Sequence, residues 1–179
     1  TLSSSSAASD VYKRQGLTLK KEKTKKKSME EIRKKAIAIQ RKLLRAVDKD
    51  AESYQEVLKA FRLPQNTEEE RLYRIKMIQR AYQKATVTPQ LVCECSIQLL
   101  NYSNALIIKG TPIAISDAGV AAFLADAALG GGLLNIGVNL ACMADRSFVK
   151  KMNLVMKQLT RKRKRMMKDI LNRLERIKV

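Results

Sequence analysis

The chain has 179 residues, and its 36 Lys and Arg against 17 Asp and Glu give a formal net charge of +19. Such a charge favours anionic partners: nucleic acid, a lipid surface or a multiply charged small substrate. The absence of histidine excludes histidine general bases, Ser-His-Asp triads and histidine-ligated metals. Seven glycines and three prolines are too few for a many-turned β fold, and they favour long helices in a single domain.

Residues 1–15 differ in composition from the rest of the chain. A serine-rich stretch leads into Asp10–Gln15, DVYKRQ, which is also the translation of a transposon end used in sequencing-library adapters. We therefore predict that residues 1–15 are a non-native, adapter-derived segment, and that residues 16–179 form the domain. A disordered tail rich in serine and alanine is the alternative.

The first helix is predicted from Ser28 to Phe61. Ser28 and Glu31 have the spacing of a capping box. Pro64 disfavours helical backbone in the residue before it and so ends the segment. Apolar residues recur between these ends at three- and four-residue spacing, as one buried stripe requires. They are Ile32, Ala36, Ile39, Leu43, Val47, Tyr54, Val57, Leu58 and Phe61.

Two further helices follow in the sequence. Thr67 and Glu70 have the spacing of a second capping box, which opens a predicted helix over residues 68–86. The next helix is predicted to start with Thr88 as its cap and Pro89 at its first position, where the missing N–H does no harm. Gly110 is typical of a residue that follows the last turn, so this helix should end at Lys109.

The fourth helix is long and almost entirely apolar. Ser116 or Asp117 is predicted to open it, and it should extend to about Met143, central in the fold and surrounded on every side. The uncharged stretch between Asp126 and Asp145 approaches the lower limit for a membrane span. Its asparagines and three consecutive glycines instead favour the central helix of a soluble bundle, with no membrane partner.

Asp145 is predicted to cap a final, strongly basic helix. Together these patterns predict an all-α fold without strands or internal repeats. The expected architecture is an antiparallel helical bundle of about five helices around the central apolar helix.

Three polar residues share one face of the apolar helix. Asp117 and Asn135 are 18 residues apart, which is five helical turns, and Asn139 follows one turn later. Buried polar groups need hydrogen-bond partners. One interpretation is structural: Asp117 caps the helix and the asparagines bond neighbouring helices. The other is a polar groove in which a carboxylate carries a proton.

The cysteines and the basic runs are further candidate sites in the sequence. Cys93, Cys95 and Cys142 do not have zinc-ligand spacing and are predicted to be small buried hydrophobes in a reducing cytosol. The basic runs at 20–27 and 161–165 are typical of solvated helix faces. Without interleaved aromatic residues they do not favour nucleic acid. A non-catalytic basic helical protein that binds nucleic acid is the alternative function.

Two blocks of the sequence are distinctive. The first is DKDAESYQEVLKAFRLPQNTEEE and the second is GTPIAISDAGVAAFLADAALGGGLLNIGVNL. Together they resemble the cyclodeaminase/cyclohydrolase family, which comprises the C-terminal module of formiminotransferase-cyclodeaminase and stand-alone bacterial methenyltetrahydrofolate cyclohydrolase-like proteins. The resemblance covers about residues 17–149.

This resemblance implies an all-helical, cytoplasmic homodimer that acts on tetrahydrofolate one-carbon derivatives. One family activity closes 5-formimidoyltetrahydrofolate to 5,10-methenyltetrahydrofolate with loss of ammonia, and the other hydrolyses the methenyl form to 10-formyltetrahydrofolate. Neither needs a metal or a cofactor other than the folate substrate. The family also has an N-terminal helix before residue 17. We therefore expect that helix to be missing here and this truncated chain to be inactive.

The resemblance and the polar stripe together suggest roles for individual residues. A carboxylate in an apolar groove can carry the proton that the departing nitrogen needs, and Asp117 is the catalytic candidate. Ser116, Asn135 and Asn139 are predicted to hydrogen-bond the pterin or to hold the one-carbon unit. Cationic side chains would bind the glutamate tail of the folate, which can be polyglutamylated. The candidates are Arg62, Lys21 and Lys23.

Overall fold

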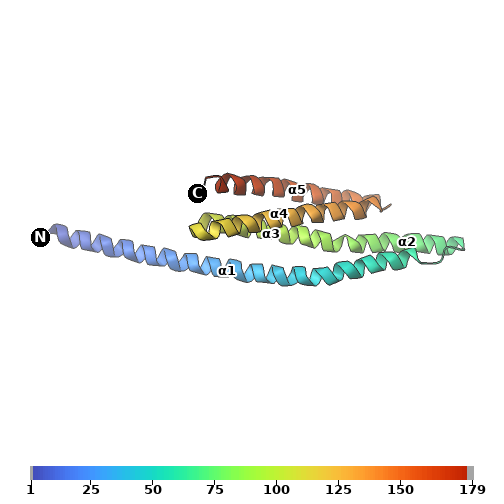
Figure 1. Cartoon of the computed structure of the whole chain (residues 1–179), viewed down its shortest axis with the longest axis horizontal. Helices are drawn as coiled ribbons and strands as arrows, with labels where there is room; N and C mark the ends of the chain where they lie inside the picture. The colour runs from blue at the N-terminus through green and yellow to red at the C-terminus, as the bar shows by residue number, and fades with distance from the viewer. Residues whose placement is uncertain (1, 177–179) are drawn as a thin grey trace. The chain divides into compact units, whose positions relative to one another are not determined.

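The described part of the computed structural model contains five helices: α1 (Leu2–Phe61), α2 (Glu68–Ala85), α3 (Val87–Lys109), α4 (Pro112–Ala141) and α5 (Arg146–Leu174) (Figure 1). Residues 26–111 and 114–176 are described in full, and only the backbone is described at 2–25, 112 and 113. No strand occurs in this part of the chain, so the predicted all-α fold is confirmed. The segment 1–15 and the side chains of Lys21 and Lys23 lie outside the fully described residues.

The chain divides into two units, Thr1–Ala38 and Ile39–Val179. The first is the N-terminal part of α1, where Arg33 and Glu30 form an exposed ion pair at 2.9 Å. The second contains the last part of α1 and all of α2 to α5. Its helices carry both hydrophobic clusters of the described residues.

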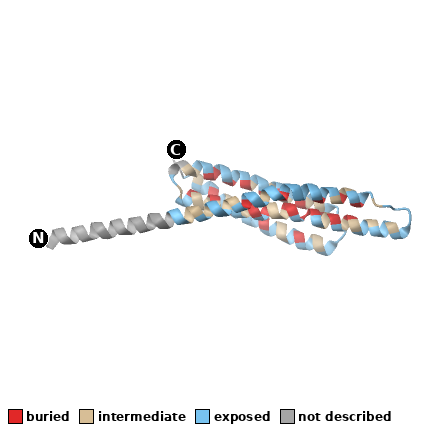
Figure 2. Ribbon diagram, turned by 90° about the horizontal axis from the view of Figure 1, so that it is seen from below, coloured by how far each residue is buried: buried red, intermediate tan, exposed pale blue. Residues whose placement is uncertain are grey.

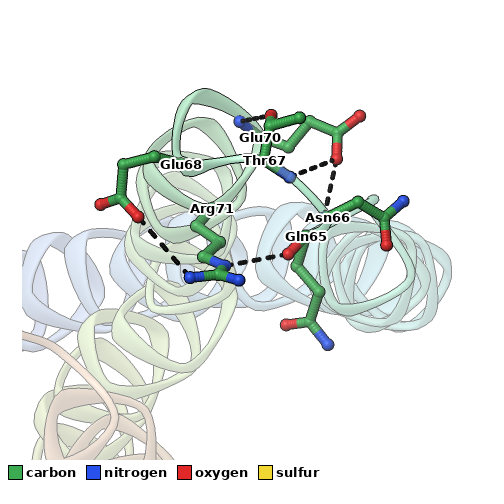
Figure 3. A network of polar contacts seen from close by, with 6 residues as sticks. All are labelled: Gln65, Asn66, Thr67, Glu68, Glu70 and Arg71. Carbon is green, nitrogen blue, oxygen red and sulfur yellow. Dashed lines mark hydrogen bonds and ion pairs between the residues drawn. The ribbon is translucent and has the colours of Figure 1, made fainter.

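Side-chain caps begin two helices where the sequence predicts them. The Thr67 hydroxyl accepts from the Glu70 N–H at 3.2 Å, and the Glu70 carboxylate accepts from the Thr67 N–H at 3.2 Å (Figure 3). At the start of α5, Asp145 Oδ1 accepts from the N–H groups of Ser147 and Phe148, both at 3.0 Å. These caps satisfy N–H groups that the first helical turn leaves without partners.

Three other predicted helix starts are wrong. α1 continues through Ser28, because the Lys- and Glu-rich residues before it also favour helix. α3 begins one residue before Thr88, since Thr86 keeps right-handed helical angles and almost joins α2 to α3. α4 begins at Pro112, so Asp117 lies in its second turn and is not a cap. In each case the residue with capping chemistry is inside a longer helix.

The main core lies between α3, α4 and α5, and the buried residues follow the inner faces of these helices (Figure 2). Leu100 of α3, Leu129 and Ile136 of α4, and Ile170 of α5 are completely buried. Burial of one such side chain contributes about 1.5–3 kcal/mol. A smaller cluster joins α1 to α2 and consists of Val57, Ala60, Ile78, Ala81 and Ala85.

The prediction that α4 is surrounded on every side is wrong. One side packs on α3 and α5, but an apolar stripe on the other side is exposed, with Leu124 at 68% and Leu134 at 73%. This α4 stripe consists of Val120, Phe123, Leu124, Leu134 and Val138. By length and composition alone, residues 68–109 and 114–141 could each cross a membrane. An exposed apolar stripe of this length is typical of a surface that contacts a partner.

Candidate functional site

Two cavities of about 380 and 360 Å³ adjoin one another between α1, the α2–α3 junction and α4. They share Asp50, Pro89 and Asn135 as lining residues, so they are two halves of one depression. We call it the α1–α4 cleft. All of its lining residues belong to the unit Ile39–Val179.

One face of α1 forms the first wall of the cleft. Its lining residues have the i, i+3, i+4, i+7 spacing of a single helical stripe. Ser53 is largely buried, and its hydroxyl donates to the main-chain carbonyl oxygen of Asp50 at 2.8 Å. The seven residues of this wall are Leu43, Ala46, Val47, Asp50, Ser53, Tyr54 and Val57.

The opposite wall is α4, and two of the predicted site residues lie there. Asn135 is exposed and lines both halves of the cleft. Asn139 is half-buried, and its Nδ2 donates to the carbonyl oxygen of Ala85 at 3.0 Å. An asparagine amide has two N–H donors and one oxygen acceptor. Asn139 therefore keeps one donor and its oxygen for other partners.

The three consecutive glycines of α4 have different surroundings. A Cβ on Gly130 would approach Arg163 of α5 at 3.2 Å, and one on Gly132 would approach Cys93 Sγ of α3 at 2.6 Å. A Cβ on Gly131 would meet nothing within 4 Å, and this residue lines the cleft. Two glycines thus let α4 approach α3 and α5 closely, and the third leaves open space in the cleft.

Tyr82 and Cys142 lie together at one end of the cleft. The hydrogen bond to Cys142, and then partial burial, raise the pKa of Tyr82. Cys142 is exposed, which corrects the prediction that all three cysteines are buried. The other two are buried: burial raises the pKa of Cys93 to about 11, and it also raises the pKa of Cys95.

The remaining predicted site residues lie elsewhere. Ser116 and Asp117 are exposed on the first half of α4, and Asp117 is about 27 Å from Asn135 along the helix axis. Neither lines the α1–α4 cleft. Arg62 is exposed in the turn after α1 and also lies outside it.

The described cationic side chains also lie outside the cleft. Among the described residues that line the cleft there is no Lys or Arg. The basic run at 161–165 is on α5, where its residues face solvent except for Arg163. Arg163 donates to both carboxylate oxygens of Asp126, at 2.5 and 2.7 Å, and so links α5 to α4. The cations expected to bind a glutamate tail are therefore absent from the described cleft wall.

Sequence reasoning missed several residues of the cleft, chiefly Asp50, Ser53, Tyr54 and Tyr82. A usable signal was present on α1. Asp50, Ser53, Tyr54 and Val57 continue the apolar stripe of Leu43, Ala46 and Val47, so polar groups interrupt a face that should be buried. A polar interruption of this kind on a core-facing stripe indicates a cavity or a site.

Comparison with known proteins gives concordant results. A family model described as formiminotransferase-cyclodeaminase matches residues 2–158. Methenyltetrahydrofolate cyclohydrolase of Methylorubrum extorquens is 33% identical over 120 residues, which are 67% of this chain and 58% of that protein. Formimidoyltransferase-cyclodeaminase of Sus scrofa is 28% identical over 134 residues, which are 75% of this chain and 25% of that protein.

A solved structure agrees with these relatives. The crystal structure of formiminotetrahydrofolate cyclodeaminase from Thermotoga maritima superposes with a TM-score of 0.65 and 25% identity, covering 83% of this chain and 67% of that one. The chain spans 58% of the length of the Methylorubrum relative. The non-native origin of residues 1–15 stays a prediction. The chain belongs to the formiminotransferase-cyclodeaminase family.

Proposed function

We propose that the α1–α4 cleft binds a tetrahydrofolate one-carbon derivative, and that the chain is a cyclodeaminase or a cyclohydrolase for it. One observation carries the proposal. The two sequence blocks that resemble the family are far apart in the chain, yet both line this cleft. The first block contributes Asp50, Ser53, Tyr54 and Val57, and the second contributes Asn135 and Asn139. Both blocks lie within the region that the family model matches.

Both reactions move protons while C–N bonds form and break. In ring closure, N10 attacks the formimidoyl carbon and loses its proton, and the departing nitrogen takes up a proton and leaves as ammonia. In hydrolysis, water adds to the methenyl carbon and gives up its two protons, one of which N5 takes up as the C–N5 bond breaks. Asn135, together with the second N–H and the amide oxygen of Asn139, can hold the one-carbon unit in attack geometry. A carboxylate can carry the proton.

Asp117 is our proposed proton carrier, and a second copy of the chain would bring it to the cleft. The α4 stripe is exposed from Val120 to Val138 and is centred near residue 129. Antiparallel pairing of two such stripes about a two-fold axis would set Asp117 of one copy opposite residue 141 of the other. That position is within one turn of Asn139.

This two-fold axis is perpendicular to both α4 helices. A residue on one flank of α4 therefore lies on the same side of the helix pair in both copies. Asp117 and Asn135 share a flank of α4, so Asp117 of one copy would face the cleft of the other. This supports a homodimer with composite sites, in which the exposed apolar stripe is buried. A cytoplasmic location stays a prediction.

The experiment is a spectroscopic assay of methenyltetrahydrofolate. Its formation from 5-formimidoyltetrahydrofolate reports the cyclodeaminase, and its loss in water reports the cyclohydrolase. Two proteins are compared: the chain as printed, and one in which a family N-terminal helix replaces residues 1–15. Turnover of either substrate by either protein supports the proposal. A folded protein of the second kind that turns over neither substrate contradicts it.

A further inference from the structure

Asp50 is the only charged side chain among the described residues that line the α1–α4 cleft. The other lining residues are apolar, or they carry neutral hydroxyl, thiol and amide groups. This is unexpected in a chain whose formal net charge is +19. The chain as a whole attracts anions, but this depression holds a single negative charge.

The carboxylate of Asp50 is also uncommitted within the described structure. Ser53 bonds to the main-chain oxygen of Asp50 and not to its side chain. By contrast, two carboxylates of this unit do have cationic partners: Glu56 accepts from Lys84 at 2.7 Å, and Asp126 accepts from Arg163. Among the described residues, the Asp50 side chain forms no such ion pair or hydrogen bond. Its two oxygens are therefore available to a ligand.

The position of Asp50 makes it a recognition group for both halves of the cleft. It lines each half together with Asn135 of α4. A carboxylate pairs best with a planar cation that presents two parallel N–H groups. Apolar walls such as Leu43 and Val92 also suit a flat ring more than a hydrated ion.

We propose that Asp50 binds the cationic, N–H-bearing part of the ligand, an amidinium-type group, and so decides which end of the substrate enters the cleft. The proposal rests on the proposed function, because a formimidoyl group is an amidine. The carboxylates of the glutamate tail are repelled by Asp50 and extend out of the cleft. Asp50 is thus a specificity-determining residue, separate from the proton carrier.

The test uses benzamidine, a planar amidinium, and its neutral isostere benzamide. Occupancy is read from the rate at which a disulfide reagent labels Cys142, which lines the same cleft. The protein is the full chain, and the variants are D50N, D50E and the matched control D48N. Asp48 is an exposed carboxylate of α1 that does not line the cleft. The ratio of labelling rates with and without ligand is compared within each protein.

Benzamidine should protect Cys142 in the wild type and in D48N, and its affinity should fall roughly tenfold in D50N. D50E should keep part of the protection, and benzamide should give little in any protein. Equal protection of D50N, equal protection by benzamide, or no protection of the wild type would overturn the proposal. Folate turnover is measured separately, so charge-selective binding can stand even if the proposed reaction fails.

Discussion

Asn139 of α4 donates a hydrogen bond from Nδ2 to the carbonyl oxygen of Ala85 at 3.0 Å, across the α2–α3 junction. In a regular helix this carbonyl would accept from the N–H of residue 89, but residue 89 is proline and has no N–H. The asparagine side chain replaces the missing backbone donor. It thereby ties the wall of the cleft to the point where α2 meets α3.

The relationship between Asn139 and Pro89 predicts a coupling between two substitutions. Asn139→Ala should reduce the free energy of unfolding by about 1–2 kcal/mol, because the Ala85 carbonyl loses its donor. Pro89→Ala restores a backbone N–H. In the Pro89→Ala background, the loss of unfolding free energy caused by Asn139→Ala should be smaller by about 0.5–1 kcal/mol. Urea denaturation of the four proteins measures the cycle, and additive effects would show that the two donors do not compete.

The glycine run supplies a matched pair of substitutions. Gly132→Ala should destabilise by about 1–3 kcal/mol, since the new methyl would meet Cys93 Sγ and the Pro89 carbonyl. Gly131→Ala should stabilise by about 0.5–1 kcal/mol, because alanine favours helix and has free space there. Thermal unfolding compares them. Equal effects of the two changes would mean that α4 does not approach α3 as described.

Thiol labelling should distinguish the three cysteines. Cys142 is exposed, whereas burial raises the pKa of both Cys93 and Cys95 and keeps them protonated. Thiolate is the reactive form, so at pH 8 a disulfide reagent should titrate one thiol rapidly in the folded chain and three in urea. Cys142→Ser should abolish the rapid phase. A rapid phase of two or three thiols would contradict the burial of Cys93 and Cys95.

Cys93 also predicts a loss of stability in alkali. Its pKa is raised from 9.0 to about 11 in the folded chain, so folding favours the protonated thiol. The resulting stabilisation is complete below pH 9 and is lost as the pH rises towards 11. Cys93→Ala removes this dependence. Between pH 8 and pH 10.5, the urea midpoint should therefore fall further in the wild type than in the variant. Equal falls in the two proteins would contradict the prediction.

The composite site predicts complementation between two inactive variants. Asp117→Asn removes the proposed proton carrier, and Asn135→Ala removes a proposed positioning group, so a homodimer of either variant should be inactive. Mixed dimers hold one intact site, and an equal mixture should recover about one quarter of wild-type activity. The experiment uses whichever of the two proteins assayed above turns over folate. The two variants are unfolded, mixed and refolded together so that their subunits exchange. Mixtures without recovery would place both residues in the same subunit's site.

The sequence by itself determined the helices and much of their order. Caps such as Thr67 and Asp145 act through bonds to residues two or three positions away, so local spacing reveals them. The same logic placed Asn135 and Asn139 on one face of one helix, because helical periodicity needs no tertiary information. The two distinctive blocks were likewise sufficient to identify the family.

The tertiary structure alone decided which of these faces form a site. Asp50 became a candidate because it lines the same two cavities as Asn135, although the two residues are 85 positions apart in the chain. α4 is apolar on all sides, so its sequence could not show that one stripe is left exposed. Helix periodicity specifies which residues lie together on a face. Which neighbour covers that face depends on long-range packing, and so does the position of the cleft at the Asn135 end of α4.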